Sequence, residues 1–128
     1  MKRILTALLT MLMILFLVTS CSPKFSPVKG GEVSARLLNT ASAEEPVSLK
    51  KEDAEQIIAY LQNLPDGRNH LCDCMADVSL TIGEQTFSYH SGSGILSEKV
   101  DGTTNHYYVG DNREAINEIL KQYITLVH

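Results

Sequence analysis

The first twenty residues form a segment of their own, and this segment decides how much of the chain is left to fold. Residues 1–3 are a short basic start, residues 4–18 contain no charged side chain, and two small residues follow. This order is that of a secretory signal. An apolar helix over residues 4–18 would reach about 22 Å, which is short of the roughly 30 Å hydrocarbon core of a bilayer. We therefore expect residues 1–20 to be removed; a permanent transmembrane anchor is the alternative.

The residues at the end of this segment carry a second signal. Val18, Thr19 and Ser20 are an aliphatic residue and two small residues, and Cys21 follows them. This order resembles the lipobox of bacterial lipoproteins. The resemblance implies cleavage before Cys21 and a diacylglyceryl group on the Cys21 sulfur, which would become the lipidation site. An ordinary signal peptide with a cysteine near its cleavage site by chance is the alternative.

The chain that starts at Cys21 is acidic. Removal of Lys2 and Arg3 changes the formal net charge from −4 to −6. Nucleic acid is bound through cationic side chains, so this composition argues against a nucleic-acid partner. We expect the membrane contact to come from lipid on Cys21, since two or more acyl chains anchor a protein stably. The expected location is the outer face of the cell membrane, or the outer membrane of a bacterium with two membranes.

The composition changes again near residue 31. Residues 22–31 contain Pro23, Pro27, Gly30 and Gly31, which is typical of extended and mobile chain. We expect residues 21–31 to be a flexible, lipid-anchored spacer and residues 32–128 to be a single small domain. Residues 32–38 alternate between apolar and polar side chains well enough to form a first strand.

Two stretches have the apolar spacing of helices. The first stripe follows Lys50 and consists of Ala54, Ile57, Ile58, Leu61 and Leu64. The second stripe closes the chain and consists of Ile116, Ile119, Leu120, Tyr123 and Val127. Asp111, with Glu114 three residues later, predicts a capping box at the start of the second helix. Steps of three and four predict that both stripes pack against a sheet.

Two tight turns lie between these helices. Gly83-Glu84 has the glycine-first pattern of a type II′ hairpin. Closing the hairpin places six mostly apolar residues on one face, and it pairs Ile82 with Gln85, Leu80 with Phe87 and Val78 with Tyr89. A slip of one residue would place polar side chains on the core face, which favours this register.

The second turn completes the fold prediction. Asp101-Gly102 joins residues 95–100 to residues 105–109, and residues 92–94 link the two hairpins. The sequence predicts an α+β domain: a helix, an antiparallel four-stranded meander and a C-terminal helix packed on one sheet face. Residues 32–38 are a candidate for an extra N-terminal strand.

Three short elements of the domain stand out beside this pattern. They are Cys72-Asp73-Cys74, Tyr89-His90-Ser91 before a glycine, and residues 117–120 in the closing helix. These elements resemble small uncharacterised extracytoplasmic lipoprotein domains of Gram-positive bacteria, over most of residues 48–124. The resemblance supports the fold and implies no activity.

The loop after the first helix holds the residues most suited to chemistry. If Cys21 carries lipid, the two cysteines that remain are Cys72 and Cys74. An even number of cysteines in an oxidising compartment favours a disulfide between them. In extended chain their Cα atoms would lie roughly 7 Å apart, at the limit for bridging, so the loop has to bend. A reversible redox role for this pair is a further alternative.

A metal site in the same loop is the other alternative. Two thiolates and His70, with Met75 nearby, suit Cu(I) or Zn(II). A fourth ligand would have to come from Asp77, His90 or His106. The identity of such a metal stays open at this point.

Residues 90–94 do not form a catalytic motif. His90, Ser91 and Ser93 are close in sequence, but a nucleophile needs a base in reach and a group that orients the base. The spacing of the glycines is not that of a nucleophile elbow. We expect a flexible turn here, with His90 in solvent on the sheet face opposite Phe87. We therefore expect no enzyme activity, no catalytic residue and no cofactor.

Two functions remain from the sequence. The first is a membrane-anchored binding or interaction module that recognises an unknown protein or small molecule. The second is a thiol-dependent metal-binding or redox lipoprotein that uses His70, Cys72 and Cys74.

Overall fold

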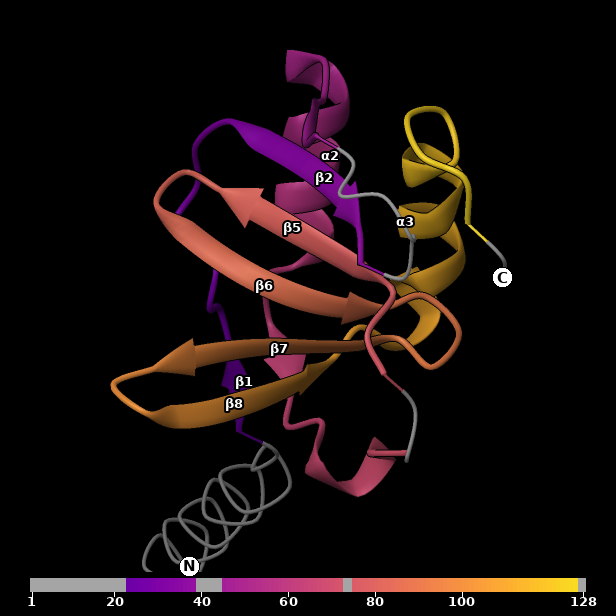
Figure 1. The fold of residues 1–128 in the computed structure, drawn as a ribbon. Coiled ribbons are helices and arrows are strands. Elements are labelled where there is room, and N and C mark those ends of the chain that lie inside the picture. Colours follow the sequence, from indigo (N-terminus) through magenta and orange to yellow (C-terminus); the bar gives the residue numbers. More distant parts are fainter. Residues whose placement is uncertain (1–22, 39–44, 73–74, 127–128) are drawn as a thin grey trace, which may run out of the picture.

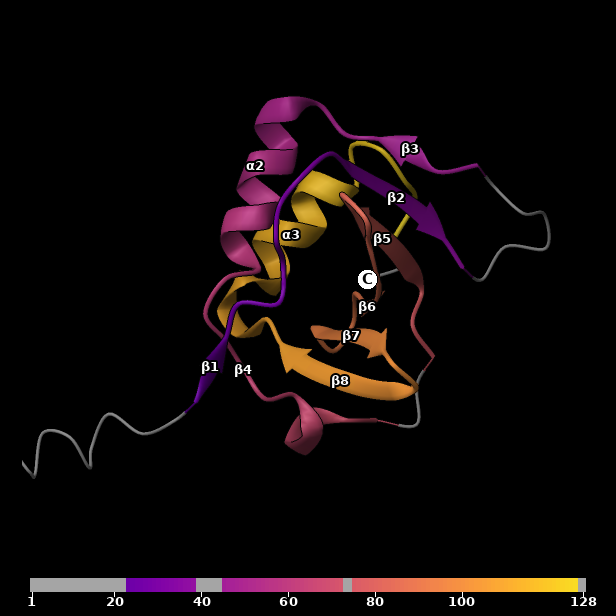
Figure 2. The ribbon, with the colours of Figure 1, turned by 90° about the vertical axis from the view of Figure 1, so that its left-hand side faces the viewer.

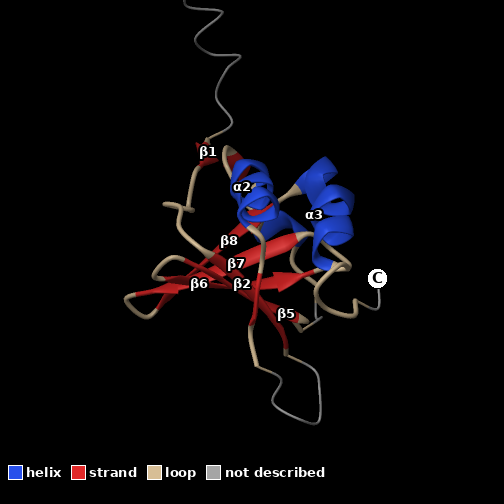
Figure 3. Cartoon of the chain, turned by 90° about the horizontal axis from the view of Figure 1, so that it is seen from above, coloured by secondary structure: helices blue, strands red, loops and turns tan. Residues whose placement is uncertain are grey.

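The computed structural model describes residues 23–38, 45–72 and 75–126, and within these a six-stranded antiparallel sheet carries two helices on one face (Figures 1 and 3). The strand order is β3-β2-β5-β6-β7-β8. The strands are β2 (Val33–Leu37), β3 (Val47–Ser48), β5 (Val78–Ile82), β6 (Gln85–His90), β7 (Ile95–Val100) and β8 (Thr103–Tyr108). The predicted α+β class and the antiparallel meander β5–β8 are confirmed, but the sheet has more strands than the predicted four.

The central hairpin has the predicted register. Strands β5 and β6 pair Val78 with Tyr89, Leu80 with Phe87 and Ile82 with Gln85. Gly83 has a φ of 60°, as a type II′ turn requires at its first central position. Asp101 and Gly102 both have positive φ, which is the type I′ pattern. Strand β8 therefore begins at Thr103, two residues before the predicted start.

Strands outside the meander extend the sheet and add a second, smaller one. The predicted N-terminal strand is confirmed as β2, which pairs Val33 with Ile82 and Ala35 with Leu80. The two-residue strand β3 then pairs with β2 at the edge. Strands β1 (Lys24–Phe25) and β4 (Leu64–Pro65) form a separate antiparallel pair. The sequence predicts none of β1, β3 and β4, because two residues are too few to show a period.

Both helices bury most of the apolar stripes that their sequences predict, but Leu64 belongs to β4, and Val127 lies outside the described residues. Helix α2 spans Lys51–Tyr60 and helix α3 spans Arg113–Leu120. Ile57 of α2 and Ile116 and Leu120 of α3 are fully enclosed. They lie in one core with inward-facing sheet residues, among them Leu80, Phe87, Tyr89 and Leu96. Among the described helices, none combines the length and apolar character needed to cross a bilayer.

The start of α3 differs from the prediction. The 3₁₀ helix η2 (Gly110–Asn112) precedes it, so Asp111 lies before the helix and Asn112 is the N-cap. Asn112 makes no side-chain cap hydrogen bond, and the predicted capping box between Asp111 and Glu114 is wrong. Gly110, with a φ of 59°, turns the chain into η2 and moves the first helical residue to Arg113.

The segment predicted as a spacer is packed on the domain from Lys24 onwards (Figure 2). Val28 is only 5% exposed. The side chain of Gln85 accepts from the Lys29 N–H at 2.8 Å and donates to the Pro27 carbonyl at 2.7 Å. These contacts fix residues 24–31, so the composition signal for mobile chain is wrong for them.

Candidate functional site

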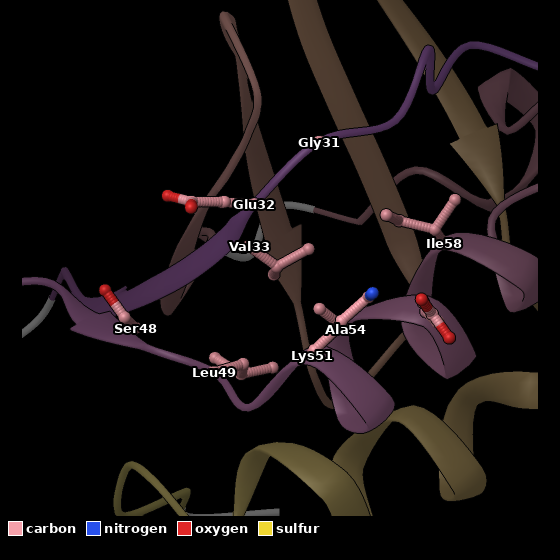
Figure 4. A pocket seen from close by; sticks show the side chains of 9 residues that line it. Gly31, Glu32, Val33, Ser48, Leu49, Lys51, Ala54 and Ile58 are labelled. Carbon is pink, nitrogen blue, oxygen red and sulfur yellow. The ribbon is translucent and has the colours of Figure 1, made fainter.

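A cavity of about 730 Å³ lies between helix α2 and the β2–β3 edge of the sheet (Figure 4). We call it the α2 cavity. Apolar side chains come from Val33, Leu49, Ala54 and Ile58, and polar ones come from Glu32, Ser48, Lys51 and Glu55. Its volume falls within the roughly 300–1,000 Å³ of small-molecule sites, which typically combine apolar walls with a few polar groups.

The local sequence explains why these side chains meet. Positions 51, 54, 55 and 58 follow the i, i+3, i+4, i+7 pattern, so they share one face of α2. Side chains of a strand alternate between the two faces, and Figure 4 shows Val33 pointing toward α2 while Glu32 points away. The Leu49 N–H donates to the Val33 carbonyl at 2.9 Å, which fixes the chain between β3 and α2.

The small side chain of Ala54 keeps this cavity open on the helix side. Lys51 and Glu55 supply charge beside it, and neither takes part in an ion pair within the described part of the chain. The arrangement can therefore bury an apolar group of a ligand and offer both an ammonium and a carboxylate to its polar end. Sequence reasoning missed this site, because the shared face of α2 reads equally well as core packing.

A second cavity, of about 200 Å³, lies on the opposite face of the sheet. It brings together Cys72, His90 and His106 with Ser93 and Ser97. The Nδ1 of His106 lies 2.7 Å from the Ser97 hydroxyl. The Nδ1 of His90 accepts from the Ser93 N–H at 2.9 Å. His90 is half-buried here, and the expectation that it lies in solvent is wrong.

The loop residues predicted as one site are separated in the structure. The His70 ring stacks on Tyr108, with 3.8 Å between centroids and 11° between planes, and His70 does not line the second cavity. Met75 is 80% exposed. Among the described residues, no group of three or more His, Cys, Asp and Glu side chains is placed to hold a metal ion.

The cysteine predictions fall mostly outside the described residues. Cys72 is disulfide-bonded, and its partner sulfur is not among the described atoms. Cys21 and Cys74 both lie outside the described ranges. The Cys72–Cys74 pairing and the lipid on Cys21 therefore stay predictions.

Ser91 is part of a buried structural network. It is fully enclosed, its N–H donates to Asp77 at 2.8 Å, and its hydroxyl also donates to the Asp77 carboxylate. The Ser91 carbonyl accepts from Asn117 at 2.9 Å and from Arg113 at 3.2 Å. This turn is therefore fixed at Ser91, in contrast to the flexible turn that we expect from sequence. The Asp77 carboxylate accepts both hydrogen bonds from Ser91, and Asp77 does not line the second cavity.

No protein-family model, no curated protein and no solved structure matches this chain.

Proposed function

We propose that this protein is a lipid-anchored extracytoplasmic lipoprotein whose domain binds a small amphiphilic ligand in the α2 cavity and has no catalytic role. The observation that carries the binding role is the cavity itself, with Val33 and Ile58 on its apolar side and with Lys51 and Glu55 beside it, which form no ion pair among the described residues. The anchor is supported by the apolar segment and by the order of residues 18–21. The ligand expected from this chemistry has an apolar body and one polar or charged end.

The anchor is tested with Cys21→Ala. This variant should incorporate no fatty acid and should accumulate as an uncleaved precursor or be released from the membrane, because the thioether can no longer form. The measurement is labelling with a radioactive fatty acid, followed by fractionation of cells. Wild-type protein that fractionates away from membranes and carries no fatty acid would contradict the proposal.

The cavity is tested with Ala54→Phe. A phenyl ring at this buried position fills the cavity and should abolish binding of 1-anilinonaphthalene-8-sulfonate, a probe with an apolar ring system and a charged end. The matched control is Ala59→Phe, since Ala59 is exposed on the same helix. Fluorescence titration is read together with the melting temperature, so that loss of folding is recognised, and Ala54→Leu serves as the smaller change. Equal binding by all variants would contradict the site.

A thiol-dependent metal-binding or redox role is the second candidate. The observation that favours it is the second cavity, where Cys72 lies with His90 and His106. The disulfide at Cys72 opposes it, because a disulfide sulfur cannot act as a thiolate ligand. Thiol titration and metal analysis of the purified protein decide the matter. If the wild-type protein has two free thiols and bound metal, and the Cys72→Ser, Cys74→Ser double variant has neither, the metal-binding role replaces the ligand-binding proposal.

A further inference from the structure

The described chain enters the domain at one edge of the sheet. Strand β1 pairs with β4, and the ring of Phe25 makes an edge contact with Tyr107, with 6.0 Å between centroids. Tyr107 belongs to β8, the edge strand opposite β3. The entry point of the chain is therefore fixed beside the β8 edge (Figure 2).

Only three residue steps separate Cys21 from Lys24. Fully extended backbone covers at most about 3.6 Å per residue, so the two Cα atoms are no more than about 11 Å apart. Lys24 is already part of β1. A lipid on Cys21 would thus hold the β8 edge close to the bilayer, and the domain could not turn this edge far from it.

We infer that the surface formed by β1, the 3₁₀ helix η1 (Arg68–His70) and the β8 edge faces the bilayer and contacts its phospholipid headgroups. We call it the anchor face. The inference rests on the proposed lipid on Cys21. Five strand spacings separate β8 from β3, which amounts to about 24 Å at 4.8 Å each. The β3 edge and the α2 cavity beside it would then lie on the far side of the sheet from the lipid, open to ligand.

The chemistry of the anchor face suits lipid headgroups. It holds a groove of about 420 Å³ whose lining includes Phe25, Arg68 and Thr104. Phe25 is 43% exposed, and the Arg68 side chain is 77% exposed. Asp66 accepts from the Arg68 Nε at 2.8 Å, which orients the guanidinium. Guanidinium groups bind phosphate well, and an exposed aromatic ring suits the interface between headgroups and acyl chains.

The distribution of charge favours the same orientation. The two helices carry five carboxylates against two bases, Lys51 and Arg113. They lie over one face of the sheet (Figure 3), and Figures 1 and 2 both show them above β8. An anionic membrane surface repels such a layer and attracts cations. Lys24 and Arg68, with Asp66 as their acidic neighbour, make the anchor face less acidic than the helices.

The test uses the lipidated mature chain in vesicles that contain anionic lipid and a lipid with a nitroxide on its headgroup. The chain has no tryptophan, so a single one reports one site. Phe25→Trp probes the anchor face, and Val47→Trp in β3 is the matched control, with exposures of 43% and 38% for the native side chains. Arg68→Trp is a second probe of the anchor face, in case Phe25→Trp disturbs β1.

The expected result is loss of most of the Trp emission at positions 25 and 68, with the emission at position 47 unchanged. Equal quenching at all three positions, or stronger quenching at position 47, overturns the orientation. The mass of the purified chain and its flotation with vesicles report the lipid separately. A chain without lipid overturns both this inference and the proposed function, whereas a lipidated chain with the reverse quenching pattern overturns the orientation alone.

Discussion

Asn117 joins the last helix to the central hairpin through two hydrogen bonds inside the core. Its Oδ1 accepts from the Tyr89 hydroxyl at 2.7 Å, and its Nδ2 donates to the Ser91 carbonyl at 2.9 Å. Asn117→Ala should lower the free energy of unfolding by about 1–3 kcal/mol, because it leaves a buried hydroxyl without a partner. Urea denaturation measures this. Asn112→Ala is the control, since its amide reaches the Tyr60 carbonyl only at 3.5 Å; an equal loss there would contradict the prediction.

Three tyrosines are expected to make the free energy of unfolding depend on pH in the alkaline range. Burial raises the pKa of Tyr89 and of Tyr107, and a hydrogen bond to Asp53 raises the pKa of Tyr123. A group whose pKa is higher in the folded protein than in the unfolded protein stabilises the fold fully at pH values below its unfolded-state pKa. This stabilisation is lost as the pH rises through its folded-state pKa. The free energy of unfolding should therefore fall above about pH 10. Tyr89→Phe should make that decline shallower in urea titrations at several pH values; an unchanged slope would exclude Tyr89 as a source.

Single residues show where sequence reasoning stops. The period of two places His90 on the face opposite Phe87, and the structure agrees. That His90 and His106 line the same cavity depends on the register of strands β6 to β8, which pairs Ser88 with Ser97 and Ser97 with His106. Cys72 reaches the same cavity from a loop. A loop has no period, so the sequence leaves this contact open and instead groups Cys72 with its neighbour His70.

At the scale of elements, turn chemistry and periodicity were sufficient for the large pieces. The β5–β6 register follows from Gly83-Glu84 together with the alternation on both sides. Helix α2 follows from its apolar stripe, although Leu64 at the end of that stripe belongs to β4. Strands β1, β3 and β4 form through partners elsewhere in the fold. The α2 cavity depends on one of them, since Leu49, which directly follows β3, lines it together with Ala54, and so the cavity could not be predicted either.

Two separate effects favour glycine at position 83, its backbone conformation and its close contact with Gly30, and a comparison with Gly102 separates them. The φ of Gly83 is positive, and a Cβ there would lie 2.6 Å from the Gly30 carbonyl oxygen. Gly102 also has a positive φ, but a Cβ there would meet nothing within 4 Å. Gly102→Ala should cost about 1–2 kcal/mol from backbone strain alone. Gly83→Ala should lower the unfolding free energy further, because it also separates the N-terminal segment from the hairpin. Equal losses in urea denaturation would remove the steric part of this argument.

At the scale of the whole molecule, the residue at which the folded part begins determines how far the domain can lie from a lipid on Cys21. Composition places the boundary at Gly31, whereas the contacts of Val28 and Gln85 place it near Lys24. Proline and glycine indicate chain without regular structure, and a packed irregular segment contains them as readily as a mobile linker. This difference of about seven residues decides how far the domain can move from a lipid on Cys21, and hence which edge of the sheet meets the membrane.

The boundary can be tested by truncation. A chain that begins at Glu32 should unfold with a free energy lower by about 1.5–3 kcal/mol than one that begins at Ser22, because it loses the burial of Val28. It also loses the Pro27 carbonyl that accepts from Gln85. Val28→Ala in the longer chain should reproduce part of this loss. Urea denaturation of the three chains provides the comparison. Identical midpoints would return residues 22–31 to the role of a free spacer, and the domain would then be able to turn its β8 edge away from the bilayer.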